Sequence, residues 1–109
     1  MQIQNPREFF EKVLPEKFDP DKAEGIDIVF QVNISGEEGG DWYVIIKDKQ
    51  IDINEGVHDD PTVGIEVKDK TWIKLVNGKT TGERAFLAGK LKVKGEVQDA
   101  LSLKVLGFL

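Results

Sequence analysis

Alternation of apolar and polar residues predicts a series of β-strands in this chain. The clearest strand runs from Ile26 to Ser35, where even-numbered apolar residues would share one buried face. Trp42 to Lys47 is apolar on both faces, which is typical of an interior strand. Asp48-Lys49 forms a plausible tight turn into a third strand, Gln50 to Asn54. The short turns between these three strands predict an antiparallel meander.

Two further strands are predicted in the second half of the chain. Apolar and polar residues alternate from Thr62 to Val67, and again from Lys90 to Lys94, where Gly95 closes the strand. The segment between these two strands holds two predicted helices rather than a hairpin. We therefore expect a crossover connection and some parallel pairing, which makes the predicted five-stranded sheet a mixed one.

Helical spacing predicts a helix at the N-terminus. Asn5 is a preferred N-cap residue, and Pro6 suits the first helical position. Pro15 is expected to end this helix, because it lacks a backbone N–H and clashes with the preceding turn. The apolar residues that share one helical face are Phe9, Phe10, Val13 and Leu14.

Two short helices are predicted between the fourth and fifth strands. Asp69 is expected to cap the first of them, and Asn77-Gly78 to end it. Thr80 with Glu83 has the pattern of a capping box at the start of the second helix. Gly89 stands at its end, where a positive φ favours glycine, so Gly89→Val is expected to destabilise the protein.

The last predicted helix changes character towards its end. Val97, Ala100 and Leu101 form one apolar seam, but Lys104 would fall on that seam if the helix continued. The residues from Leu103 to Leu109 are then apolar nearly all round. A helix tolerates such a surface only when it is buried or meets a partner or a ligand.

Composition and charge limit the classes of protein to which this chain can belong. The chain has 109 residues and no cysteine, so one domain over residues 1–109 is expected, without disulfides or thiolate metal sites. Its 15 basic and 20 acidic residues are interspersed and give a net charge of −5, which disfavours nucleic-acid binding. No signal peptide and no run of about 20 apolar residues is present. A cytoplasmic protein is expected.

The chain offers little to catalytic chemistry. His58 with Asp59 and Asp60 lies ahead of Pro61 without a second ligand cluster, which favours a turn over a metal site. The glycines from Gly36 to Gly40 lack the Lys-Ser/Thr of a phosphate loop. No nucleophile and base stand at a supporting spacing. The sequence therefore predicts no enzyme, no metal and no cofactor.

Two features allow a ligand. The lysines between Lys90 and Lys94 could attract phosphates of a membrane or of coenzyme A, although a solvated strand face near a sheet edge is favoured. The predicted helices and sheet also supply more apolar surface than a 109-residue core needs, with the surplus at the C-terminus. Most of these residues belong to an ordinary core, but a hydrophobic ligand cavity is the sharper hypothesis.

Several motifs occur in an order that is specific to one family. They are Val29-Phe30-Gln31-Val32-Asn33-Ile34, Gly39-Gly40-Asp41-Trp42, Asp60-Pro61-Thr62-Val63 and the segment from Ala85 to Glu96. From about residue 5 to residue 106 the chain resembles the sterol carrier protein type 2 lipid-binding domain. The resemblance implies an α+β fold, with helices covering one face of a five-stranded mixed sheet and an apolar tunnel between the two layers. It also implies a domain that is not itself an enzyme.

We therefore hypothesise a lipid-binding or lipid-transfer protein. The ligand classes that the resemblance implies are fatty acids, fatty acyl-coenzyme A, sterols and phospholipids, and transient membrane contact is compatible with transfer. The alternative is an interaction module whose apolar C-terminus docks on a partner enzyme or a second copy, as a homodimer, without a lipid. Lys104 is weighed between pairing with an anionic headgroup and an ordinary helix-end lysine, which is favoured. The residues expected at or near the tunnel are Phe30, Val32, Ile34, Trp72, Val76, Phe86, Leu101, Leu103, Lys104, Val105, Leu106 and Phe108.

Overall fold

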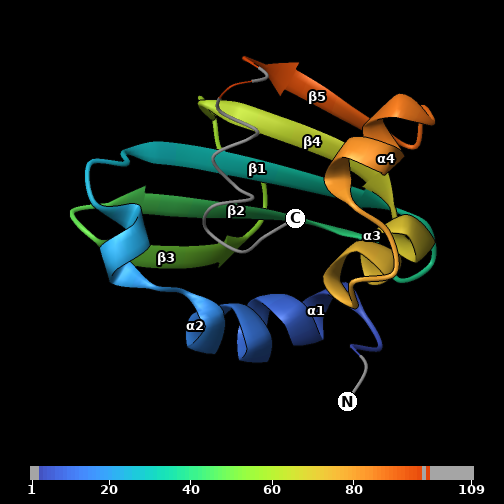
Figure 1. Ribbon diagram of the computed structural model, residues 1–109, viewed down its shortest axis with the longest axis horizontal. Coiled ribbons are helices and arrows are strands. Elements are labelled where there is room, and N and C mark those ends of the chain that lie inside the picture. Colours follow the sequence, from blue (N-terminus) through green and yellow to red (C-terminus); the bar gives the residue numbers. More distant parts are fainter. Residues whose placement is uncertain (1–2, 97, 99–109) are drawn as a thin grey trace.

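The computed structural model describes residues 3–96 and 98. Its centre is a five-stranded sheet in the order β3-β2-β1-β4-β5, which runs from bottom to top in Figure 1. The meander is as predicted, since β2 pairs antiparallel with both β1 and β3. Asp48 and Lys49, which both have positive φ, make the tight turn between β2 and β3. The strands are β1 (Ile28–Ser35), β2 (Gly40–Lys47), β3 (Gln50–Glu55), β4 (Val63–Lys68) and β5 (Leu91–Gly95).

The sheet is mixed, but its parallel pair is not where the sequence suggested. β4 runs parallel to β1, with Val32 opposite Ile65, whereas β4 and β5 are antiparallel. The expected parallel pairing is therefore present, but between β1 and β4, and the predicted crossover from β4 to a parallel β5 is wrong. Val67 at the end of β4 lies opposite Leu91 at the start of β5. The two intervening helices thus begin and end at the same end of the sheet, and the chain must turn back.

The N-terminal helical segment is longer than predicted. It comprises α1 (Pro6–Glu8), a π-helical turn (Phe9–Val13) and α2 (Leu14–Lys17). Pro15 does not end it, because the helix widens just before the proline and the Leu14 N–H donates to the Phe9 carbonyl five residues back. The Asn5 cap is confirmed, since its side-chain oxygen accepts from the Glu8 N–H at 2.9 Å. A 3-10 turn, Pro20–Ala23, then leads into β1.

The two helices between β4 and β5 begin one residue away from their predicted caps. α3 (Asp69–Val76) starts with Asp69 inside it, and that carboxylate accepts from the Glu38 N–H across the β1–β2 turn. α4 (Gly82–Leu87) is capped by Thr81, not Thr80, through the Arg84 N–H. Adjacent threonines made the choice ambiguous in the sequence. Gly78 and Gly89 end the helices with φ near +74°, as predicted.

One face of the sheet carries the core. Even-numbered residues of β1 and their neighbours on β2, β4 and β5 are buried there, against Phe9, Phe10, Leu14 and Trp72 of the helices. In Figure 1, α1 and α2 run below the sheet, next to β3. The outer face is polar, and a single row across it is formed by Asp41, Asn33, Glu66 and Lys92.

Candidate functional site

A stack of aromatic rings lies at the centre of the buried face. The ring of Phe10 lies between the indoles of Trp42 and Trp72, with centroid distances of 4.9 Å and 5.5 Å and interplanar angles of 10° and 6°. Phe9 meets Trp72 edge-on at 5.5 Å. Helix α1 and the π-helical turn bring the phenylalanines to β2 and α3, so the stack ties three elements together. We refer to Trp42, Phe10, Trp72 and Phe9 as the aromatic stack.

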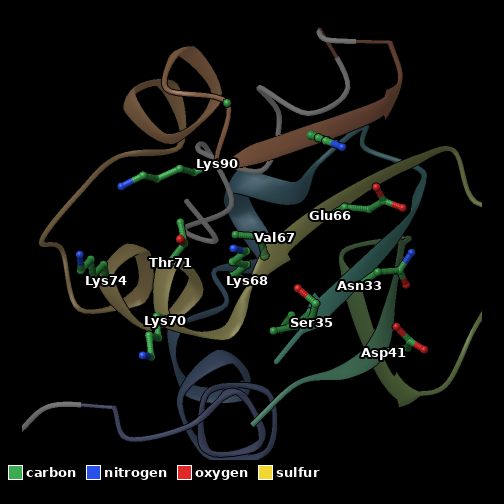
Figure 2. Close-up of a pocket in the computed structure, with 13 residues that line it drawn as sticks. Asn33, Ser35, Asp41, Glu66, Val67, Lys68, Lys70, Thr71, Lys74 and Lys90 are labelled. Atoms are coloured by element: carbon green, nitrogen blue, oxygen red, sulfur yellow. The ribbon is translucent and has the colours of Figure 1, made fainter. Parts of the chain in front are cut away.

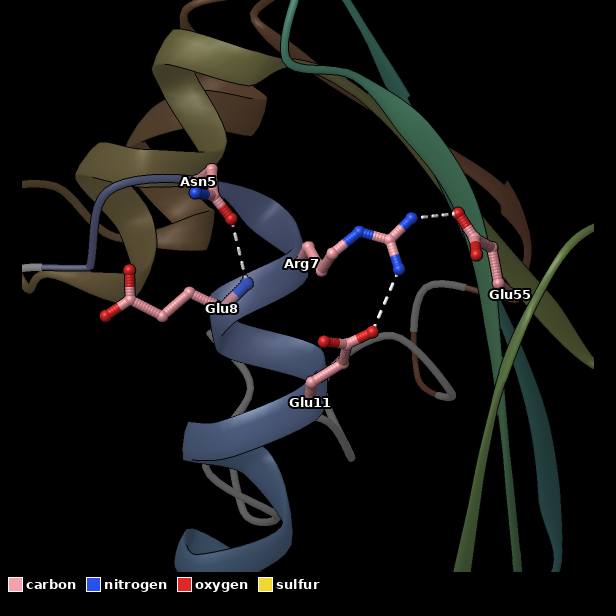
Figure 3. A network of polar contacts seen from close by, with 5 residues as sticks. All are labelled: Asn5, Arg7, Glu8, Glu11 and Glu55. Atoms are coloured by element: carbon pink, nitrogen blue, oxygen red, sulfur yellow. Dashed lines mark hydrogen bonds and ion pairs between the residues drawn. The ribbon is translucent and has the colours of Figure 1, made fainter.

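A cation closes the outer end of the aromatic stack. The Arg7 guanidinium carbon lies 5.2 Å from the Trp42 ring centroid, within the range of a cation–π contact. Its nitrogens bind Glu11 at 2.8 Å and Glu55 at 2.6 Å, as Figure 3 shows. Hydrogen bonds to Glu11 and then Glu55 raise the pKa of Arg7 above its ordinary value. Arg7 therefore joins the N-terminal helix to β3 while covering the ring of Trp42.

One polar atom inside the aromatic stack has no partner. The side chain of Trp72 is fully buried, and its indole nitrogen Nε1 donates no hydrogen bond. A buried donor without an acceptor costs about 1–3 kcal/mol. An oxygen atom of a molecule inside the apolar layer would remove that cost by accepting from Nε1.

The described candidate ligand residues fall into two groups. Phe30, Val32 and Trp72 are fully buried and Ile34 nearly so, which confirms that the even-numbered face of β1 points inward. Val76 is partly buried against the same core. Phe86 differs, because 41% of its surface is exposed. Contact of these residues with a ligand stays a prediction. The remaining candidates lie outside the described residues: Leu101, Leu103, Lys104, Val105, Leu106 and Phe108.

A cavity at one end of the sheet was not predicted from the sequence. It has a volume of about 740 Å³ and opens between α3 and the sheet (Figure 2). Residues of the outer face line it, and so do Ile34 and Val67 of the buried face. We call it the lysine cavity, because five lysines line it: Lys68, Lys70, Lys74, Lys90 and Lys92. Only Lys90 and Lys92 were considered from the sequence, since nothing in the spacing relates them to the lysines near α3. The antiparallel pairing of β4 with β5 brings the two groups together.

Lys94, the third lysine of the β5 run, behaves differently from its neighbours. Its ammonium lies 2.8 Å from a Glu66 carboxylate oxygen on β4. The hydrogen bond from Lys94 lowers the pKa of Glu66, and the charge of Lys92 adds a smaller effect in the same direction. Lys94 thus stabilises the β4–β5 pair instead of remaining available to a ligand.

His58 takes part in turn chemistry, as the sequence favoured. The ring nitrogen Nδ1 of His58 accepts from the Asp60 backbone N–H at 3.0 Å, and the His58 backbone N–H donates to the Gln31 side-chain oxygen at 2.8 Å. Gln31 is buried on the outer face of the sheet and also donates to the Trp42 carbonyl. These bonds hold the loop before β4 against the sheet.

The described residues form neither a metal-binding cluster nor a membrane-spanning helix. Across residues 3–96 and 98, no three His, Asp or Glu side chains are grouped in a way that could hold a metal ion. Within the same residues, none of the helices has the length and apolar character needed to cross a bilayer.

Comparison with known sequences identifies relatives of the whole described fold. Residues 9–106 match the SCP-2 sterol transfer family. Hydroxysteroid dehydrogenase-like protein 2 of Bos taurus is 30% identical over 96 residues, which cover 87% of this chain and 23% of the bovine protein. The chain thus spans about a quarter or less of the length of the curated relatives it matches.

Comparison with solved structures shows the same fold. The palmitated SCP2L2 protein of Aedes aegypti superposes with a TM-score of 0.70 at 24% identity, covering 94% of this chain and 95% of that one. The sec-alkylsulfatase Pisa1 of a Pseudomonas species gives 0.79 at 20% identity, covering 97% of this chain but only 16% of the sulfatase. The fold therefore occurs both as a small protein and as a minor part of a large enzyme.

Proposed function

Because the chain belongs to the SCP-2 sterol transfer family, we propose that it binds a hydrophobic ligand between its sheet and helices and carries that ligand without transforming it. The match of residues 9–106 to the family carries this proposal. The likeness to a palmitated protein favours a fatty acyl chain as ligand, with fatty acyl-coenzyme A, sterols and other lipids as alternatives. The dehydrogenase in the relatives' name is not assigned to this chain, because the match covers a small share of those proteins.

Partition of an acyl chain out of water supplies the driving force. Burying about 14 methylenes at roughly 0.8 kcal/mol each gives about 11 kcal/mol before costs. Association and ordering consume roughly 4 to 15 kcal/mol of that gain. Micromolar affinity with low selectivity among chains is the expected result, and it suits a carrier that must also release its ligand.

The apolar layer around the aromatic stack supplies the proposed site. Phe30 and Val32 of β1 and Ile34 beyond them would form its floor, and Trp72 and Val76 of α3 a wall. Because these residues pack closely, with Phe30, Val32 and Trp72 fully buried, the ligand must displace side chains rather than fill an open channel there. The Trp72 Nε1 donor gives such a ligand one fixed polar contact, with a carboxylate, carbonyl or hydroxyl oxygen.

Extraction of the purified protein tests the proposal directly. Organic extraction followed by mass spectrometry is expected to recover a lipid in near-stoichiometric amount, and titration with a fluorescent fatty acid is expected to saturate. Two tryptophans in one stack allow the same titration to be followed by intrinsic emission. Recovery of no lipid together with no saturable binding would overturn the function.

A pair of variants tests the role of Trp72. Trp72→Phe keeps an aromatic ring but removes the N–H, so affinity for a fatty acid is expected to fall by about fivefold, the value of roughly one net hydrogen bond. Trp42→Phe is the matched control, because that indole stacks on the other side of the same Phe10 ring. Equal effects of the two changes on affinity would contradict a hydrogen bond from Trp72 to the ligand, but would not contradict lipid binding itself.

A further inference from the structure

The lysine cavity lies next to the proposed lipid site, at the end of the sheet where β1 and β4 finish. Asn33 and Glu66 line it from the outer face, whereas Ile34 and Val67, their neighbours in sequence, line it from the buried face. In Figure 2 the lysines Lys70, Lys74 and Lys90 lie on one side of the cavity, and Asn33, Asp41 and Glu66 lie on the other. The cavity therefore places charged side chains beside the apolar layer, with which it shares Ile34.

Charge is concentrated in this cavity against the trend of the chain. It is lined by five lysines and two carboxylates, which leaves 10 of the 15 basic and 18 of the 20 acidic residues elsewhere. In the described part of the chain, the ion pairs involve Arg7 and Lys94, and the five cavity lysines make none. One of the two carboxylates, Glu66, is already bound to Lys94.

Such an arrangement favours an anion of high charge. Ammonium groups gathered around a concave surface repel one another and focus a positive potential, which an entering anion relieves. Lysine recognises phosphate as a point charge through three rotatable donors, and the Thr71 hydroxyl in the same cavity supplies a further donor. A carboxylate ligand could accept hydrogen bonds from only one or two of these groups, whereas a phosphate offers several acceptor oxygens and up to two charges.

We propose that the lysine cavity binds a phosphate-bearing headgroup. This chemistry is common to anionic phospholipids at a membrane surface and to soluble phosphate compounds. The segment that supplies Gly89 and Lys90 to the cavity also exposes Leu87, 89% of whose surface is open to solvent. A phosphate that belongs to a bilayer would bring acyl chains towards that leucine, while a soluble phosphate would not.

Charge-matched variants test the proposal in the full chain. Lys70→Gln/Lys74→Gln/Lys90→Gln removes three charges from the cavity. Lys22→Gln/Lys47→Gln/Lys49→Gln removes three exposed charges at the opposite end of the sheet, near the β2–β3 turn. Both sets are on the surface, so both proteins should fold, and circular dichroism checks this. Fatty-acid titration of both variants should match the parent protein, which separates this proposal from lipid binding in the apolar layer.

Two probes distinguish the sources of phosphate. One is a phosphatidylcholine vesicle containing phosphatidic acid, measured by co-sedimentation, and the other is inorganic pyrophosphate, measured by calorimetry. At about 0.1 M salt the cavity variant is expected to bind at least about tenfold more weakly, and the control within about twofold of the parent. Binding to the vesicle alone assigns a lipid headgroup, and binding to pyrophosphate assigns a soluble compound or both. No binding to either probe, or equal losses in the two variants, would overturn the site.

Discussion

In the described structure, the side chains of the aromatic stack contact partners within the protein, whereas many of those around the lysine cavity do not. In the stack, each ring contacts another ring, and Arg7 at its end binds two carboxylates while covering Trp42. Around the cavity, five lysines make no ion pair within the described residues, and Leu87 of the adjoining α4 is almost fully exposed. The same chain thus satisfies nearly every group in one region and leaves many unsatisfied in the other.

This contrast separates folding from recognition. Buried apolar surface supplies most of the stability of a small domain, so the stack should dominate the free energy of unfolding. Solvated lysines cost little in the folded state and remain available to a ligand. The exception within the stack is Trp72 Nε1, the one buried side-chain nitrogen or oxygen without a hydrogen-bond partner among the described residues, and it lies where the apolar ligand is proposed.

Truncation of a buried ring in the stack and of an exposed ring on α4, the helix next to the cavity, gives the largest expected difference. Phe10→Ala removes a fully buried ring that touches three aromatic neighbours, and it should lower the free energy of unfolding by about 3–5 kcal/mol. Phe86→Ala makes the same chemical change at a ring that is 41% exposed, and it should cost about 1 kcal/mol. Urea denaturation measures both. Losses of similar size would contradict the division between the regions.

Much of the stack's framework was predictable from the sequence, because it rests on periodicity. Alternation over ten residues identified β1 and its inward face, and the spacing of Phe9 and Phe10 placed them on one helical face. The path of the helix past Pro15 was not predictable in the same way, since a single π-helical turn depends on how both ends of the segment pack. The partners of Phe10 belong to β2 and α3, which only the tertiary fold brings together.

The lysine cavity was less accessible to sequence reasoning. Its lysines come from the end of β4, from α3 and from the start of β5 with the residue before it. A wrong assumption of parallel pairing between β4 and β5 would have placed the two groups at opposite ends of the sheet. Charged residues also carry no periodic signal that distinguishes a solvated face from a binding site. Lys94 shows the difficulty, because it continues the pattern of Lys90 and Lys92 yet is bound to Glu66.

The turn that delivers β5 to the cavity offers the next largest effect. Gly89 has φ +74° and nothing lies within 4 Å of the position that a Cβ would take, so Gly89→Val strains the backbone without a clash. The expected loss is about 1–2 kcal/mol, measured by thermal or urea unfolding. Ala88→Val is the control, because Ala88 is exposed with φ −81°. Equal losses of unfolding free energy in the two variants would show that side-chain size, not the positive φ of residue 89, causes the destabilisation.

Comparison of Trp72 with Trp42 tests the effect of the unpaired indole nitrogen of Trp72 on stability. Trp72→Phe and Trp42→Phe each exchange a buried indole beside Phe10 for a smaller ring. Trp72→Phe also removes the unpaired N–H, whereas Trp42→Phe weakens the contact with Arg7. In lipid-free protein, Trp72→Phe should therefore destabilise by about 1 kcal/mol less. A larger loss for Trp72→Phe would mean that its N–H is not a cost to the folded state.

The smallest expected effect concerns Glu66 at the border of the lysine cavity. Its pKa is lowered in the folded protein, first by the hydrogen bond from Lys94 and least by the charge of Lys92. The pair therefore contributes stability above the ordinary glutamate pKa of about 4.3, and this contribution is lost as the pH falls through the lowered value. Because both side chains are well exposed, the change is expected to be visible in an NMR titration of the Glu66 carboxyl rather than in the unfolding midpoint.

Removal of each lysine in turn separates the two causes. Lys94→Gln should return the pKa of Glu66 most of the way to its ordinary value, and Lys92→Gln should raise it only slightly. If Lys92→Gln has the larger effect, Lys92 acts on Glu66 more strongly than its ion-pair partner Lys94 does. Lys92 would then be partly neutralised by Glu66, and the contrast between a satisfied stack and an unsatisfied cavity would hold for four lysines instead of five.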